Sequence, residues 1–199
     1  MIANQWAWNF PPDSGSSGFS PHRDGGVVDY DWFPEGKPVR DNGLPLLGTI
    51  WIPLTDVTPL NSCMYLLPVD KDPHVPDNLD ATTIRQESIQ DIRALPCKAG
   101  SILYWNPNVL HWGSNGSEYA GEPRMSFATY LLSDGLTKTK DSFSLAKAQP
   151  LPLAYRLRLI AVNMASYGGH LMNCPPDLTG YCELYANCQP HDLNFKISL

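Results

Sequence analysis

The sequence predicts an all-β core of short strands arranged as a jelly roll, with one helix toward the end of the chain. Composition is the first reason: the 199 residues include 15 glycines and 19 prolines, well above the average share of about 12%, so turns are frequent and long helices few. The second is a series of short runs rich in β-branched and aromatic residues. The third is that the gaps between these runs are turn-like, whereas a parallel sheet needs helical crossovers.

The strands are predicted from apolar runs bounded by turn residues. In chain order they cover 46–54, 62–69, 101–105, 109–113 and 124–132, with a shorter aromatic strand at 4–10 and weak alternation at 91–97. Only TDVTPLN separates the first two, which are therefore expected to be antiparallel neighbours. A short helix is expected near 81–90. Apolar residues at helical spacing predict a longer helix over 151–167, ended by Gly168 and Gly169, and 171–199 is expected to be an irregular tail.

Charge and hydropathy exclude several classes of protein. The net charge is −6 and no basic stripe is visible, so nucleic acid is not an expected partner. There is no apolar run of about 18 residues, so no membrane span is expected, and the first residues, MIANQWAWNFPPD, lack the features of a secretory signal. The length fits a single domain, 1–199.

The cysteines number five and are irregularly spaced, which does not resemble a disulfide framework. Reduced thiols and a cytoplasmic location are expected. The last three, together with His170 and His191, could form a zinc site, but they include no Cys-x-x-Cys pair. The alternative is that they are small buried apolar side chains. The five are Cys63, Cys97, Cys174, Cys182 and Cys188.

A candidate metal site begins with His22-Arg23-Asp24. In an extended segment, residues i and i+2 point to the same side, so one imidazole and one carboxylate can meet the same ion. Alone, this pattern is weak. His111 adds to it because it lies on a predicted strand among apolar neighbours. Two histidines and one carboxylate form the facial triad that suits non-haem Fe(II) and leave coordination positions open, whereas a structural zinc site would have four protein ligands.

Arg124 and Ser126 complete the candidate site. Arg124 is the first residue of the predicted strand that follows His111. A turn of about ten residues, SNGSEYAGEP, is expected to bring Arg124 back beside His111. A guanidinium fits a carboxylate in bidentate fashion, and Ser126 offers a hydroxyl on the same strand face. The pair suits the distal carboxylate of 2-oxoglutarate. Two further basic residues, Arg23 and Lys71, could either bind an anionic substrate or be solvated. Four aromatic residues could either line a cavity or belong to the core: Trp51, Tyr65, Tyr104 and Trp112.

These motifs together resemble the phytanoyl-CoA dioxygenase family of Fe(II)/2-oxoglutarate oxygenases. The matching stretches are HRD at 22–24, GTIWIPLTDVTPLNSCMYLLP at 48–68 and AGSILYWNPNVLHWGSNGSEYAGEPRMSFATYLL at 99–132. The resemblance implies a double-stranded β-helix (cupin-like jelly roll) and a dioxygenase that uses Fe(II), 2-oxoglutarate and O2 and releases succinate and CO2. It implies iron at His22, Asp24 and His111, and 2-oxoglutarate at Arg124 and Ser126.

Two departures from the family pattern bear on function. The family often has Pro-Gly-Ser-His after the second matching strand, where this chain has LPVDKDPH, which implies a remodelled loop. Only 21 residues precede His22, fewer than in the family, so the expectation is that the chain lacks the family's N-terminal region, obtains it from a partner chain or is a truncated product. Related halogenases replace the carboxylate with a small residue, so within this resemblance Asp24 implies hydroxylation, or another oxidation, of a small-molecule substrate rather than halogenation. The alternatives are a cupin-like metal enzyme that does not use 2-oxoglutarate, and a non-catalytic or truncated binding protein with this fold.

Overall fold

The computed structural model describes residues 5–12, 18–24 and 39–133, all of which belong to one unit, Met1–Ser142. This part of the chain is rich in β-structure, as predicted. Its only helices are two short 3₁₀ turns, and none of the described helices is long and apolar enough to cross a membrane. The elements are β1 (Gln5–Phe10), β2 (Leu47–Pro53), β3 (Met64–Leu67), η4 (Val69–Lys71), η5 (Gln86–Asp91), β4 (Arg93–Leu95), β5 (Leu103–Trp105), β6 (Leu110–Gly113) and β7 (Arg124–Leu132).

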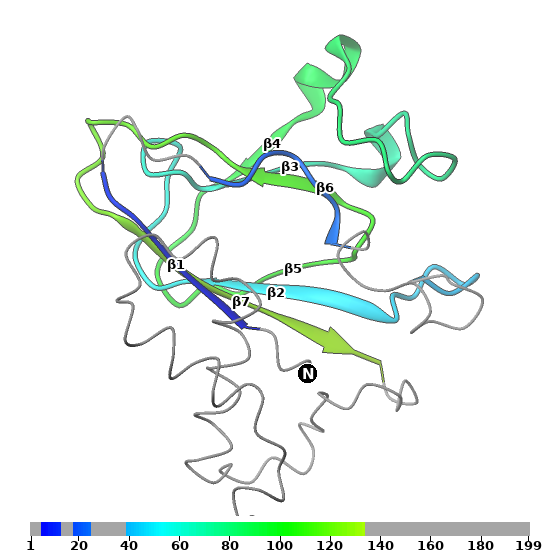
Figure 1. Ribbon diagram of the computed structural model, residues 1–199, viewed down its shortest axis with the longest axis horizontal. Helices are drawn as coiled ribbons and strands as arrows, with labels where there is room; N and C mark the ends of the chain where they lie inside the picture. The colour runs from blue at the N-terminus through cyan, green and yellow to red at the C-terminus, as the bar shows by residue number, and fades with distance from the viewer. Residues whose placement is uncertain (1–4, 13–17, 25–38, 134–199) are drawn as a thin grey trace, which may run out of the picture. The chain divides into compact units, whose positions relative to one another are not determined.

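The strands form two antiparallel sheets, which appear as two layers in Figure 1. The larger sheet has the order β1-β7-β2-β5 and the smaller one β4-β3-β6. Residues directly opposite one another in antiparallel strands share a face. Thr49 is opposite both Tyr130 and Trp105, so these three side chains belong to one face of the larger sheet.

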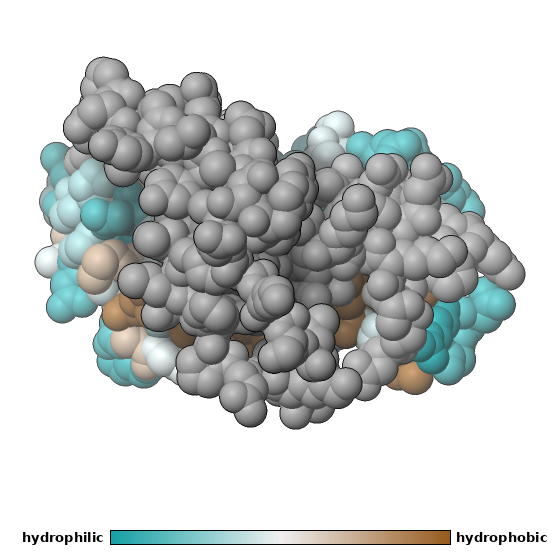
Figure 2. All heavy atoms as spheres, turned by 60° about the horizontal axis from the view of Figure 1, so that its bottom comes forward, coloured by the Kyte–Doolittle hydropathy of each residue, from teal (hydrophilic) through white to brown (hydrophobic). Residues whose placement is uncertain are grey.

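That face is the buried one. The core is made by large apolar side chains of both sheets, among them Trp51 and Trp105 from the larger sheet and Met64 from the smaller. Large apolar side chains also remain exposed, such as Ile102 and Tyr119. In Figure 2, hydrophobic residues are interspersed with hydrophilic ones on the visible described surface, which is usual for a folded protein.

The positions of the predicted strands are confirmed, but two predicted pairings are wrong. β2 and β3 were expected to be neighbours, as were β6 and β7, and in both cases the two strands lie in different sheets. A turn signal shows that the chain reverses, but it does not show whether the chain returns to the same sheet or crosses to the other layer. Crossing is favoured here because it lets the apolar faces of the two sheets cover each other.

The helix predictions have two outcomes. The segment near 81–90 forms only the 3₁₀ turn η5, with one buried residue, Ser88. The helix expected over 151–167 and the tail over 171–199 lie outside the described residues.

Candidate metal centre

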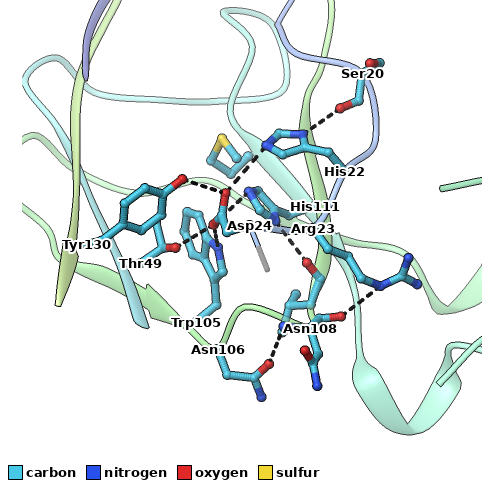
Figure 3. Close-up of polar contacts among 12 residues, drawn as sticks. Ser20, His22, Arg23, Asp24, Thr49, Trp105, Asn106, Asn108, His111 and Tyr130 are labelled. Atoms are coloured by element: carbon cyan, nitrogen blue, oxygen red, sulfur yellow. Dashed lines mark hydrogen bonds and ion pairs between the residues drawn. The ribbon is translucent and has the colours of Figure 1, made fainter. Parts of the chain in front are cut away.

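Three side chains from distant parts of the sequence meet between the two sheets. His22, Asp24 and His111 each offer one ligand atom, and these atoms all lie within 4.8 Å of one another. Asp24 and His111 are buried, while the side chain of His22 keeps 33% of its surface exposed. The three side chains point toward one another in Figure 3, and His22 is the most exposed of them.

The two histidines are held together by the backbone. The segment 18–22 runs antiparallel to β6, and His22 and His111 exchange two N–H···O hydrogen bonds of 3.0 Å each. Further along, the amide of Gly113 donates to the carbonyl of Phe19 at 3.2 Å. The two backbones come so close that a Cβ on Gly18 would lie 2.5 Å from the Cα of Gly113. Glycine is therefore required at this contact.

Each imidazole is oriented by its Nδ1 atom. His22 Nδ1 lies 2.8 Å from the carbonyl oxygen of Ser20, and His111 Nδ1 lies 3.0 Å from that of Val109. A carbonyl can only accept, so Nδ1 carries the proton in the neutral rings and Nε2 has a free lone pair. The Nε2 atoms face the carboxylate of Asp24 at 3.8 and 3.5 Å. Burial lowers the pKa of His111, which keeps this ring neutral and able to bind a metal ion at pH 7.

Asp24 is held by three neutral donors of the larger sheet (Figure 3). Its Oδ2 accepts hydrogen bonds from Thr49 Oγ1 at 2.5 Å and Trp105 Nε1 at 2.9 Å, and its Oδ1 accepts one from the Tyr130 hydroxyl at 3.2 Å. These hydrogen bonds fix the orientation of the carboxylate. Such contacts behind a metal ligand typically change metal affinity by about 10–100-fold when they are removed.

Arg124 is a buried cation whose described surroundings contain no carboxylate partner. Its Nη1 donates to the carbonyl of Ser62 at 2.9 Å, its guanidinium lies 4.2 Å from the ring centroid of Phe10, and its Nε has no hydrogen-bond partner. Burial lowers the pKa of Arg124 to about 10. Ser126, two residues further along β7, is fully buried and its Oγ is also unpaired. Two unpaired donors on one strand face favour an anionic ligand there.

The structure places Arg124 differently from the sequence prediction. β7 is not the neighbour of β6, so Arg124 does not lie beside His111 in one sheet. It approaches β6 from the other sheet: a Cβ on Gly113 would lie 3.0 Å from its Nη1. Arg124 thus lies close to the strand that carries His111, through packing between layers rather than through a hairpin.

Sequence reasoning missed the donors to Asp24, whereas core positions, one of the two alternatives for the candidate aromatics, are found for two of the four. Thr49, Trp105 and Tyr130 have no local motif, and only the register between strands brings them together. Of the four aromatics considered, Trp51 belongs to the core. Tyr65 packs against the same core and also stacks on Trp112, on the strand positions opposite to the face of His111. Tyr104 is 55% exposed.

The structure also distinguishes between the two alternatives, substrate binding or solvation, for the basic residues Arg23 and Lys71. Lys71 is exposed, consistent with a solvated side chain. Arg23 is neither solvated nor available to an anionic substrate, because it is buried and paired with Asp72. A buried guanidinium with a carboxylate partner has no surface left for a further anion.

Comparison with known sequences assigns the chain to a family. Residues 2–118 match the model of the phytanoyl-CoA dioxygenase (PhyH) family. This match spans more than half of the chain and includes His22, Asp24 and His111, and the chain belongs to this family. No curated relative matches the sequence.

The solved structures that match the chain have low sequence identity to it. EctD from S. alaskensis, determined with 2-oxoglutarate and 5-hydroxyectoine, is 17% identical with a TM-score of 0.48, over 75% of this chain and 50% of that one. The non-heme alpha ketoglutarate dependent epimerase SnoN from nogalamycin biosynthesis is 19% identical with a TM-score of 0.46, over 76% and 56%. EvdO2 from Micromonospora carbonacea var. aurantiaca is 18% identical with a TM-score of 0.45, over 74% and 56%. The chain spans about half the length of these proteins.

Proposed function

We propose that the chain is a non-haem Fe(II)- and 2-oxoglutarate-dependent dioxygenase that hydroxylates a small-molecule substrate. The overall reaction is R–H + 2-oxoglutarate + O2 → R–OH + succinate + CO2, in which one oxygen atom enters the substrate and the other enters succinate. The observation that carries the proposal is the meeting of His22, Asp24 and His111, with both Nε2 lone pairs turned toward one carboxylate.

The donor set fits Fe(II). Two neutral imidazoles and one carboxylate are the ligands of the facial triad, and no fourth His, Cys, Asp or Glu joins this group in the described part of the chain. Coordination positions therefore stay free for a co-substrate and O2. The bound iron would supply the site at which O2 is activated. The chain's own residues hold the ligands, and the presence of Asp24 supports hydroxylation rather than halogenation.

The polar groups on β7 support 2-oxoglutarate as the co-substrate. A buried guanidinium is costly without an anion, and Arg124 has no carboxylate partner among the described residues. The distal carboxylate of 2-oxoglutarate would satisfy the unpaired Nε of Arg124 and the unpaired hydroxyl of Ser126. The substrate would approach beside His22, the exposed ligand.

The same proposal extends to the fold. Two facing antiparallel sheets with the site between them are the arrangement expected of a double-stranded β-helix. Under this proposal, residues 1–199 contribute to one oxygenase domain.

The experiment that tests the function is anaerobic titration of the metal-loaded protein with 2-oxoglutarate. We expect a visible charge-transfer band, and succinate when air is admitted. His111→Ala should bind no metal. Arg124→Met should keep the metal and raise the 2-oxoglutarate concentration required by at least about 30-fold, because truncating one partner of a buried charge pair costs about 2–5 kcal/mol.

Three outcomes would contradict the proposal. Absence of metal binding by the wild type would favour a binding protein with this fold. Metal binding without the band and without succinate would favour a metal enzyme that does not use 2-oxoglutarate. Unchanged 2-oxoglutarate binding by Arg124→Met would remove Arg124 from the site. Tyr104→Phe, on the exposed face of β5, is the matched control and should behave as wild type.

A further inference from the structure

Arg23 lies between two of the candidate ligands, yet its side chain points away from them, toward Asn108 (Figure 3). Its guanidinium donates in three directions: Nε to the carbonyl of Asn108 at 3.0 Å, Nη1 to the carbonyls of Leu79 and Ala81, and Nη2 to the carboxylate of Asp72. Only 3% of the Arg23 side chain and 1% of the Asp72 side chain are exposed. The pair is therefore enclosed by protein.

Asp72 is fixed as firmly as its partner. One carboxylate oxygen accepts from Arg23, and the other accepts from the amide of His74 at 3.0 Å. Asp72 belongs to LPVDKDPH, the stretch in which the sequence departs from the family's Pro-Gly-Ser-His pattern. The departure thus supplies the acid that the arginine between the ligands requires.

The contact with Asn108 connects Arg23 to the third ligand. Asn108 precedes Val109, whose carbonyl accepts from Nδ1 of His111 and so sets the orientation of that ring. The turn is tightened by Asn106, whose side chain accepts from the amide of Asn108 at 2.9 Å and whose carbonyl accepts from the amide of Val109 at 3.2 Å. A displacement of Asn108 would therefore turn the imidazole of His111.

We propose that Arg23 and Asp72 are a positioning pair that sets the geometry of all three metal ligands. This inference rests on the proposed function. Arg23 fixes the backbone between His22 and Asp24 directly, and it fixes His111 through the turn at Asn108. The rigid fork of a guanidinium can reach all four acceptors at once, whereas the single ammonium of lysine cannot. Asp72 compensates the buried charge and holds the fork in place.

The alternative is that the pair only stabilises the loop that contains Asp72. A buried ion pair is not in itself a sign of net stabilisation, so stability alone cannot separate the two roles. They differ in what happens to metal binding in a protein that is still folded.

The test uses Arg23→Lys and Asp72→Asn, with anaerobic Co(II) titration followed by the visible Co(II) spectrum, and circular dichroism of the metal-free proteins. Arg23→Lys keeps the charge opposite Asp72 and therefore keeps the fold. We expect it to weaken Co(II) binding by about 10–100-fold, the usual effect of losing a contact behind the ligands, and to alter the Co(II) bands. Asp72→Asn should also weaken Co(II) binding and alter the Co(II) bands. If Asp72→Asn fails to fold, the result with Arg23→Lys alone tests the positioning role.

The control is Asp56→Asn, which removes a different ion pair, with Lys98, on an exposed loop. It should leave both Co(II) affinity and spectrum unchanged. If Arg23→Lys folds and binds Co(II) with wild-type affinity and spectrum, the positioning role is wrong, whatever its melting temperature. If the wild type itself binds no metal, the proposed function fails and this inference with it, so the two failures are distinguishable.

Discussion

His22 and His111 lie opposite each other across an antiparallel bridge, with two backbone hydrogen bonds of 3.0 Å and ring centroids 4.4 Å apart. The spacing of the two rings is therefore set by main-chain pairing. Side-chain rotation alone cannot separate them, because each Nδ1 is fixed to a carbonyl. Substitutions that move the backbone at His22 away from the backbone at His111 should weaken metal binding even when the candidate ligands themselves are unchanged.

The close approach of Gly18 and Gly113 gives the first prediction. Gly18→Ala would place a Cβ 2.5 Å from the Cα of Gly113, so the segment carrying His22 must move away from β6. We expect a loss of about 1–3 kcal/mol in the free energy of unfolding, as for other overpacked sites, and weaker Co(II) binding. Urea denaturation and metal titration measure the two effects. Gly121→Ala is the control, because an added Cβ there meets nothing within 4 Å; an equal effect of both would contradict the explanation.

The donors to Asp24 give the second prediction. Trp105→Phe keeps a ring in the core but removes the Nε1–H that donates to Asp24 at 2.9 Å. Because hydrogen bonds to charged groups contribute about 1.5–3 kcal/mol, we expect the metal-free protein to lose about that much unfolding free energy in urea. Metal affinity should fall as well. Tyr104→Phe changes the neighbouring residue of the same strand on its exposed side and should change neither quantity. If Trp105→Phe changed neither the unfolding free energy nor the metal affinity, the carboxylate of Asp24 would not need this donor.

Arg124 gives a prediction in which stability and function move in opposite directions. Burial lowers the pKa of Arg124 to about 10, which shows that the folded state disfavours its charge. Arg124→Met removes that charge at the expense of the contacts with Ser62 and Phe10. We expect the free energy of unfolding without ligand to rise by about 1–3 kcal/mol, while 2-oxoglutarate no longer stabilises the protein. Thermal unfolding with and without 2-oxoglutarate measures both, and a lower stability of the variant would show that the cation is compensated.

The two described cysteines give a pH-dependent prediction. Both are free, and burial raises the pKa of Cys63 and of Cys97. The thiolate is the reactive form, so a raised pKa means that less of it exists at any pH below the shifted value. We expect slow alkylation of both at pH 7.5 in the folded protein, with Cys97 reacting first as the pH rises past 9 because Cys63 is wholly buried. Peptide mapping by mass spectrometry after iodoacetamide treatment would show the order, and rapid labelling of Cys63 at neutral pH would contradict it.

Local patterns were enough to predict the strands. The run predicted at 124–132 forms β7 with the same bounds, and the run at 46–54 contains β2. Strand formation depends on alternation and β-branched residues within a few positions, which the sequence shows directly. The partner of each strand depends on which apolar faces cover each other, and that is not a local property. The partition of β2 and β3 into different sheets could therefore not be predicted from the turn between them.

The candidate site shows the same division. The sequence by itself indicated the candidate ligands, two histidines and one carboxylate, and the presence of an arginine and a serine spaced two residues apart on one strand. Only the tertiary structure decided that Thr49, Trp105 and Tyr130 surround Asp24, that Arg124 reaches β6 from the opposite sheet, and that Arg23 is buried against Asp72. The reason is physical: ligand chemistry resides in single side chains, whereas these contacts depend on strand register and layer packing between residues far apart in the chain.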